Sequence, residues 1–257
     1  MRELTKGFFA QLHVIHALIL RETRSRFGKY NLGYIWAFVS PLSTIALFWG
    51  MFAIGKRAPH AGMDPIGFLS TGFLPYYIFT GCQAKAGAAV QSNKALLYYP
   101  QVHPLDLVAA RAILETVTLT IVFFFLMLLN TIYTQHLPLE SSLQTLSGLG
   151  LAALLGTSLG LVFCAIKIEF PTFDHLIGPL MRPLFWTSGL FFSVSEIPGW
   201  TRDLLLWNPV LHIVEFTRDG WFRNYDSPYH SYEYVLLWIL GLGFVGLFLE
   251  KLTRRKI

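Results

Sequence analysis

The stretch from Gly50 to Arg57, GMFAIGKR, has the spacing of a phosphate-binding loop. That motif, G-x-x-x-x-G-K followed by Ser or Thr, needs the final hydroxyl to hold magnesium and a preceding β-strand to aim its backbone amides. Here arginine stands in the hydroxyl position, and the stretch ends an apolar run of helical length. We therefore expect no ATP site in this chain.

The histidines and carboxylates do not indicate a metal site. His13 with His16, and His103 with Asp106, have helical spacing. A protein metal site needs three or four converging ligands, and the sequence does not suggest such a group. We expect no enzyme chemistry in this chain, and neither a metal nor another cofactor.

Three cations lie inside apolar runs, namely Lys85, Arg111 and Arg182. At about 1.5 Å per residue, each lies about 9–12 Å from the nearer polar end of its run. Two interpretations compete. The long side chains could bend back to the headgroups, or they could form a ring of positive charge that favours an anionic substrate. Lys85 and Arg182 are the better candidates for such a ring, because Arg111 has Glu115 as a possible i,i+4 partner.

Aromatic residues inside the runs could hold sugar rings, although ordinary packing would explain each of them singly. The candidates are Tyr76, Tyr77, Phe185 and Trp186. The last two lie in GPLMRPLFWTSG, where two prolines four residues apart remove backbone donors and kink a helix. Such breaks are tolerated where a helix lines protein or water, so we expect this segment to line a passage.

The elements that must position these residues are predicted to be membrane helices. The chain has 257 residues, of which 54% are hydrophobic and only 14% charged, whereas soluble domains carry about 25% charged residues. Crossing a membrane takes about 20 apolar residues, and backbone groups in lipid must be satisfied internally. We therefore predict an all-α, polytopic membrane protein. Six expected spans are Gly33–Gly55, Ile66–Ser92, Leu105–Tyr133, Leu143–Ile166, Asp174–Val194 and Tyr232–Glu250.

The distribution of Lys and Arg predicts the orientation, because cytoplasmic loops carry an excess of both. With both termini inside, twelve such residues face the cytoplasm and five face outward. The excess charge therefore marks topology, and nucleic-acid binding is not needed to explain it. We expect residues 1–32 to form an amphipathic helix on the cytoplasmic interface and residues 33–257 to form one transmembrane domain.

The connection between the fifth and sixth expected spans has a pattern of its own. It holds two short apolar stretches, Trp200–Trp207 and Val210–Phe222, divided by Asn208 and Pro209. Each stretch is too short to span a bilayer. We expect two short helices that re-enter the outer half of the membrane, and a hairpin lying on the surface is the alternative. The connection NKALLYYPQVHPLD, which follows the second span, has a small helical pattern and a proline stop.

Three stretches together resemble the ABC-2 permeases that export polysaccharides, especially the inner-membrane permeases of group 2 capsule exporters. They are LILRETRSRFGKYNLGYIWAFVSPL, NKALLYYPQVHPLDLVAAR and RPLFWTSGLFFSVSEIPGW followed by LLLWNPVLHIVEFTRDGWF. The likeness covers nearly the whole chain, in the same order. It implies a transport subunit whose ATP and magnesium are bound by a separate subunit.

The resemblance also implies partners and roles. The permease would be a homodimer bound to a pair of cytoplasmic ABC ATPase subunits, with a periplasmic co-polymerase-type protein and an outer-membrane channel beyond. Its cargo would be a lipid-linked acidic polysaccharide. The coupling helix would span 93–103, with contact residues Asn93, Lys94, Leu96, Leu97, Tyr98, Tyr99, Pro100 and His103. The outer helices would shape the periplasmic exit through Trp200, Trp207, Asn208, Pro209 and Trp221.

Two alternatives remain open at this point. One is a permease of the same fold that exports O-antigen or teichoic acid. The other is an ion-coupled transporter that needs no ATPase. Against the second stand the lack of an internal repeat and the scarcity of carboxylates inside the expected spans, where Glu115 is the only deep one.

Overall fold

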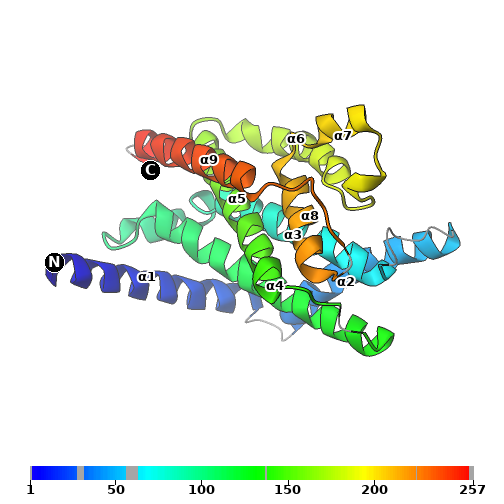
Figure 1. Cartoon of the computed structure of the whole chain (residues 1–257). Coiled ribbons are helices and arrows are strands. Elements are labelled where there is room, and N and C mark those ends of the chain that lie inside the picture. The colour runs from blue at the N-terminus through cyan, green and yellow to red at the C-terminus, as the bar shows by residue number, and fades with distance from the viewer. Residues whose placement is uncertain (1, 28–31, 56–62, 137, 224, 255–257) are drawn as a thin grey trace.

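The computed structural model describes residues 2–27, 32–55, 63–136, 138–223 and 225–254, and the regular secondary structure in those residues is helical. This confirms the all-α class. Figure 1 shows how the helices are arranged. They are α1 (Arg2–Phe27), α2 (Leu32–Ile54), α3 (Pro65–Gly87), α4 (Pro104–Thr134), α5 (Ser142–Glu169), α6 (Asp174–Thr187), α7 (Gly199–Leu205), α8 (Pro209–Trp221) and α9 (Tyr232–Thr253). The 3₁₀ helices among the described residues are η2 (Gln91–Tyr98), η3 (Pro171–Phe173) and η4 (Val194–Glu196).

Several of these helices are long and apolar enough to cross a membrane. Within the described part of the chain, four meet both conditions: Ile35–Ile54 of α2, and α4, α5 and α9. At 23 residues, α3 is about 35 Å long but more polar. The expected fifth span, 174–194, is not one helix. The helix α6 has 14 residues and ends at Thr187, after about 21 Å. It ends early because Pro179 and Pro183 remove backbone hydrogen bonds from the helix. Gly189, at φ 73°, then turns the chain.

The helix α3 occupies the centre of the fold. It packs against α2, α4, α5 and α8, and Figure 1 shows it enclosed by them. Leu69, Phe73, Leu74 and Ile78 are fully buried. Polar residues of α3 such as Ser70, Thr71 and Gln83 are also buried. The Thr71 hydroxyl bonds within the helix, donating to the Gly67 carbonyl at 2.9 Å. This burial explains why α3 is less apolar than the lipid-facing helices.

Small residues on one face of α5 let α3 approach closely. Gly148, Ala152, Gly156 and Gly160 recur every four residues and are buried. A Cβ added at Gly156 would lie 2.2 Å from the backbone oxygen of Phe79 in α3. Small-xxx-small faces of this kind bring membrane helices into direct backbone contact.

The residues GTSLG, 156–160, also fit the G-x-S-x-G spacing of a hydrolase nucleophile turn. That motif requires a sharp strand-to-helix turn that exposes the serine. Here the five residues lie in the middle of α5, and the two glycines serve helix packing.

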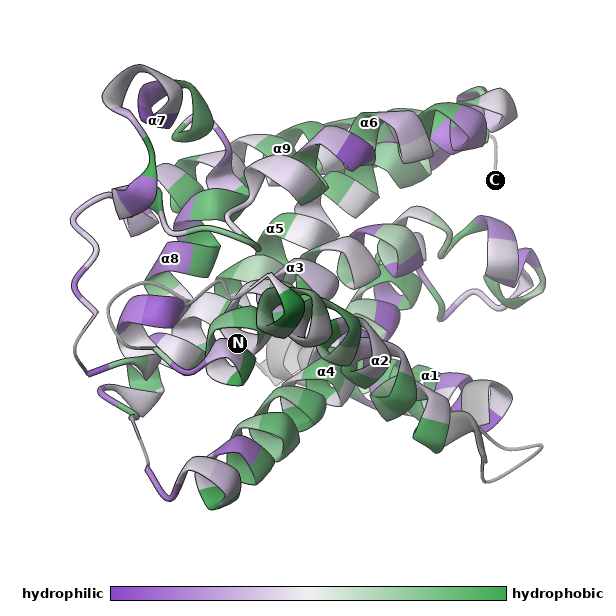
Figure 2. Ribbon diagram, turned by 90° about the vertical axis from the view of Figure 1, so that its right-hand side faces the viewer, coloured by the Kyte–Doolittle hydropathy of each residue, from purple (hydrophilic) through white to green (hydrophobic). Residues whose placement is uncertain are grey.

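The polarity of the surface follows the same arrangement. Figure 2 shows long helices dominated by hydrophobic residues, with hydrophilic residues concentrated near the connections and on α8. Exposed apolar residues are spread along α2, α4 and α9, for example Leu47, Ile121 and Leu240. Such residues suit a lipid environment or a subunit contact.

The α3–α5 contact predicts that Gly156→Ala destabilises the protein. Its methyl group would overlap the Phe79 carbonyl oxygen, and overpacking of this kind costs about 1–3 kcal/mol. Gly150→Ala is the matched control on the same helix, because no atom lies within 4 Å of its added Cβ. Thermal unfolding of the protein in detergent should show a lower midpoint for Gly156→Ala alone. Equal midpoints for the two variants would refute the close contact.

Candidate functional site

The connection 91–103 differs from the single helix expected over 93–103. Residues Gln91–Tyr98 form a 3₁₀ helix with a break at Asn93 (φ −132°, ψ 26°), and a turn follows. Pro104 does not end this connection but begins α4, because proline fits the first helical position, where no N–H bond is needed. The N–H of His103 donates to Asp106 Oδ2 at 2.8 Å and caps α4.

The expected partner-contact residues of this connection divide into two groups. Asn93 is buried, where it accepts from Arg21 at 3.0 Å and donates to the Ala89 carbonyl. Leu96 and Leu97 are half-buried against a hydrophobic cluster that contains Leu18 of α1 and Leu107 of α4. Tyr98 and Tyr99 are 88% and 62% exposed. Lys94, Pro100 and His103 are exposed as well. These residues and the two tyrosines are the expected contact residues that another protein could reach.

A groove of about 300 Å³ lies beside these tyrosines. The 91–103 connection supplies most of its lining, and the last turn of α9 supplies Arg254. Glu250 holds that guanidinium through both carboxylate oxygens, at 2.9 and 3.1 Å, and raises the pKa of Arg254. The groove is lined by Lys94, Leu97, Tyr98, Tyr99, Pro100, Val102, His103, Pro104 and Arg254. It is a basic and aromatic surface.

Polar contacts tie α1 to the 91–103 connection and to α4. They are Gln11–Asp106, Arg21–Asn93 and Glu22–Arg111. Arg111 Nη2 forms an ion pair with Glu22 of α1, 3.1 Å long, a long-range partner that the sequence did not suggest. Arg111 also donates to the Ala88 carbonyl at 3.3 Å. The cation is therefore part of the α1–α4 contact.

The 91–103 connection also reaches α5. The Gln91 amide donates to the Lys167 carbonyl at 3.2 Å, and the Lys167 ammonium pairs with Asp174 at the start of α6. A force applied to the connection would therefore act on α1, α4, α5 and α6 together.

The structure brings the four expected aromatic pathway residues together between α3 and α6. The ring centroids of Tyr76 and Phe185 are 5.6 Å apart, those of Tyr76 and Tyr77 are 6.3 Å apart, and those of Phe185 and Trp186 are 5.2 Å apart. Trp186 is 63% exposed. Arg182 is exposed on α6 and Lys85 is half-buried on α3, whereas Arg111 is engaged by Glu22.

The expected outer gate residues also divide. Trp200 and Trp207 are exposed around α7. Asn208 is buried and caps α8, accepting from the Val210 N–H at 2.9 Å, and Pro209 is the first residue of that helix. Trp221 is buried against Phe123, with ring centroids 5.6 Å apart. Of the two short helices, α8 therefore packs in the core, against α3 and α5, and only α7 is peripheral.

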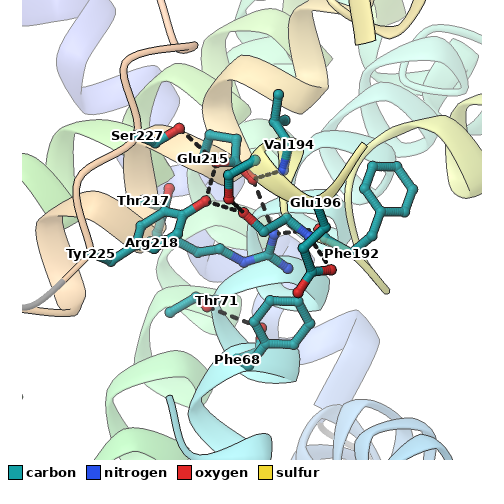
Figure 3. Close-up of polar contacts among 12 residues, drawn as sticks. Phe68, Thr71, Phe192, Val194, Glu196, Glu215, Thr217, Arg218, Tyr225 and Ser227 are labelled. Carbon is teal, nitrogen blue, oxygen red and sulfur yellow. Dashed lines mark hydrogen bonds and ion pairs between the residues drawn. The ribbon is translucent and has the colours of Figure 1, made fainter. Parts of the chain in front are cut away.

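A buried ion pair on α8, shown in Figure 3, holds the connections around this helix. Arg218 is completely buried. Its Nη1 lies 3.3 Å from Glu215 Oε1 and donates to the Phe192 carbonyl at 3.0 Å. The guanidinium also lies 4.0 Å from the ring centroid of Phe68 on α3, a favourable cation–π geometry.

Glu215 accepts hydrogen bonds from the connection that precedes α8 and from the one that follows it. It accepts from the Val194 N–H at 3.3 Å, from the Ser227 hydroxyl at 2.8 Å and from the Tyr225 hydroxyl. Burial and the nearby Glu215 carboxylate both raise the pKa of Tyr225, so its hydroxyl keeps the proton that it donates. Sequence reasoning missed this cluster because it placed Arg218 in an external loop, and the i,i+3 spacing of Glu215 and Arg218 was the only signal.

The buried pair predicts that Glu215→Gln destabilises the protein strongly. It would leave the Arg218 charge buried without its counter-ion, and breaking such pairs costs about 3–5 kcal/mol. Glu140→Gln is the control, because Glu140 and Arg223 form an exposed ion pair at 3.3 Å, and exposed pairs contribute about 0–1 kcal/mol. Thermal unfolding in detergent should separate the two variants clearly. A similar midpoint for both would contradict a structural role of the cluster.

Comparison with known proteins assigns the chain to a family. The family described as ABC-2 type transporter matches residues 13–222. The chain is 33% identical to the polysialic acid transport protein KpsM of Escherichia coli over 250 residues, which cover 97% of this chain and 96% of that protein.

Two further relatives have names that specify capsule polysaccharide export. The capsule polysaccharide export inner-membrane protein BexB of Haemophilus influenzae is 29% identical, over 94% of this chain and 91% of its own. The capsule polysaccharide export inner-membrane protein CtrC of Neisseria meningitidis serogroup B is 31% identical, over 92% and 89%. With matches of this extent along its length, the chain belongs to the ABC-2 type transporter family.

Proposed function

We propose that this protein is the transmembrane permease subunit of an ABC exporter that moves lipid-linked capsular polysaccharide across the bacterial inner membrane. The observation that carries the proposal is the nearly full-length similarity to KpsM, BexB and CtrC, whose names specify polysialic acid transport or capsule polysaccharide export. The apolar helices α2, α4, α5 and α9 support a membrane location.

The energy would come from ATP bound with magnesium by a separate pair of ABC ATPase subunits. Their contact would be the 91–103 connection, where Tyr98 and Tyr99 project outward beside the basic groove. The bonds of this connection to α1 and α5, and its direct continuation into α4, support a mechanical role. They would pass a movement of the ATPases to several helices at once.

The working permease would be a homodimer, with the polymer passing between two copies near the second and fifth expected spans. The whole length of α6 supports this, because no residue of that helix is buried within one chain. The aromatic cluster of α3 and α6 would then border the passage, with Lys85 and Arg182 nearby to favour an acidic polymer. A periplasmic co-polymerase-type protein and an outer-membrane channel would receive the polymer.

Both termini would lie in the cytoplasm. The start of α1 and the end of α9 lie at the same end of the molecule in Figure 1, and Arg254 at the end of α9 lines the same groove as Tyr98. The peripheral helix α7 lies at the opposite end. An ATPase bound at the groove would therefore share its side of the membrane with both chain ends.

Site-directed crosslinking tests the ATPase contact. A cysteine at Tyr98, with Cys82 and Cys164 replaced by alanine, should form a crosslink to the co-expressed ATPase whose yield changes with nucleotide. A cysteine at Tyr133 is the control, because Tyr133 is 77% exposed near the far end of α4 and should give no such product. An ATPase crosslink at Tyr133 with none at Tyr98 would place the contact on the wrong face.

If Lys85 and Arg182 form a ring of positive charge along the passage, neutralising them should slow export. The double variant Lys85→Gln/Arg182→Gln should slow export of an acidic capsule polymer while the dimer still assembles, since a positively charged passage attracts such a polymer. Lys251→Gln/Arg223→Gln removes the same charge from exposed positions and should export normally. Capsule at the cell surface is the measurement. Normal export by both double variants would refute the hypothesis that Lys85 and Arg182 form a ring of positive charge that favours an acidic polymer.

A further inference from the structure

The groove beside Tyr98 and Tyr99, of about 300 Å³, brings together two parts of the chain that are distant in sequence. Its lining comes from the 91–103 connection with the first residue of α4, and from the end of α9, which supplies Arg254. A partner seated in this groove would contact the connection and α9 at the same time. The contact with α9 extends the proposed ATPase site beyond the connection itself.

The charge of the groove narrows the kind of partner. Lys94 and Arg254 both line it, and both are exposed. None of the described residues that line it is acidic. A surface of one sign attracts a partner of the opposite sign and fixes its register. The groove therefore favours a partner that carries a carboxylate or a phosphate.

The guanidinium of Arg254 is held in one orientation. The buried Glu250 carboxylate accepts from its Nε at 2.9 Å and from its Nη2 at 3.1 Å. Among the described residues, Glu250 is the one acceptor found for this guanidinium. A guanidinium has five N–H donors in a planar fork, so the N–H groups that Glu250 does not engage can bind an acceptor in the groove. Such forks bind carboxylates through two parallel hydrogen bonds.

The tyrosines add an apolar requirement. Tyr98 and Tyr99 are largely exposed, and Leu97 and Pro100 also line the groove. Tyrosine is enriched at protein interfaces, where it supplies a large contact area. A small anion could bind the two cations but would leave these side chains uncovered. A peptide segment with an acidic residue among apolar ones matches both features of the groove.

The two sides of the groove rest on the same buried residues. The helix α9 packs along α5, and a Cβ added at Gly246 would lie 3.0 Å from the Leu161 side chain of α5. Leu161 belongs to the hydrophobic cluster that contains Leu107 of α4, and Leu97 packs against that cluster. A partner that moved the connection and the end of α9 together would therefore act on α5 through both.

We propose that this groove receives an acidic segment of the ATPase subunit, whose carboxylate binds Arg254 and Lys94 while neighbouring apolar side chains cover Tyr98 and Tyr99. This inference rests on the proposed function, since its partner is the proposed ATPase. The segment holds α9 as well as the 91–103 connection. Movement of the ATPase then reaches α9 and α5 as well as α1 and α4.

Binding of the purified ATPase to the full permease in phosphatidylcholine nanodiscs tests the two cations. Arg254→Gln and Lys94→Gln should each bind the ATPase about tenfold more weakly than the unaltered permease, because each loses a charge-assisted hydrogen bond. Added salt should weaken binding by the unaltered permease, and should weaken binding by Arg254→Gln less. Lys251→Gln is the matched control and should bind normally, because Lys251 is exposed on α9, three residues before Arg254, and does not line the groove.

A carbodiimide tests the chemistry of the partner, because it joins an amine to a carboxylate that is in contact with it. In the assembled complex, peptide mapping should find Lys94 joined to an Asp or Glu of the ATPase. Lys251 should not be joined to the ATPase.

Equal ATPase affinity of Arg254→Gln and the unaltered permease would overturn the proposal, as would carbodiimide products at Lys251 in place of Lys94. An effect of Arg254→Gln that appears in phosphatidylglycerol nanodiscs and not in phosphatidylcholine would also overturn it, in favour of a lipid headgroup. If one of these results is obtained while Tyr98→Cys still crosslinks to the ATPase, the permease function stands and only the acidic segment fails. No binding of the ATPase by the unaltered permease would contradict the proposed function itself.

Discussion

The backbone contact between α3 and α5 is the constraint on which the rest of the structure depends. In lipid, the hydrophobic effect does little to drive helices together, so association relies on close packing and hydrogen bonds. Gly156 allows α5 to meet the Phe79 carbonyl of α3 directly, and Gly148 does the same for Thr217 of α8. These approaches place α3 inside the fold, where its aromatic residues meet α6 and its Gly81 meets Glu115 of α4.

The two ends of the molecule are held by different interactions. At one end, Glu215 and Arg218 bind the connections around α8 through a dense set of buried hydrogen bonds. At the other, the 91–103 connection contacts its neighbours through single bonds such as Arg21–Asn93 and Gln91–Lys167, and two tyrosines stay exposed. A densely bonded end opposite a lightly bonded end with exposed tyrosines would suit the proposed permease, which is driven from one side.

Much of this could be read from the sequence, and what could not has physical causes. Apolar runs of the right length predicted the all-helical class, because burying a backbone in lipid requires internal hydrogen bonds. The predicted length of the fifth span was wrong, because Pro179, Pro183 and Gly189 end α6 early. The ion pair of Arg111 with Glu22 could not be read from the sequence, because the two residues are 89 positions apart and only the tertiary position of α1 brings them together. From the sequence, Trp221 and Asn208 likewise look like residues at the membrane boundary. In the structure, both are buried in the core.

Transport by the reconstituted complex tests the proposed export function. The permease, reconstituted into lipid vesicles with its co-expressed ATPase, would be given a lipid-linked capsular polysaccharide on the ATPase side, and protection of the polymer from an added glycosidase would be followed over time. We expect ATP and magnesium to produce protected polymer and a non-hydrolysable nucleotide to produce none. Steady ATP hydrolysis by the assembled complex, with the polymer remaining fully accessible to the glycosidase, would contradict it.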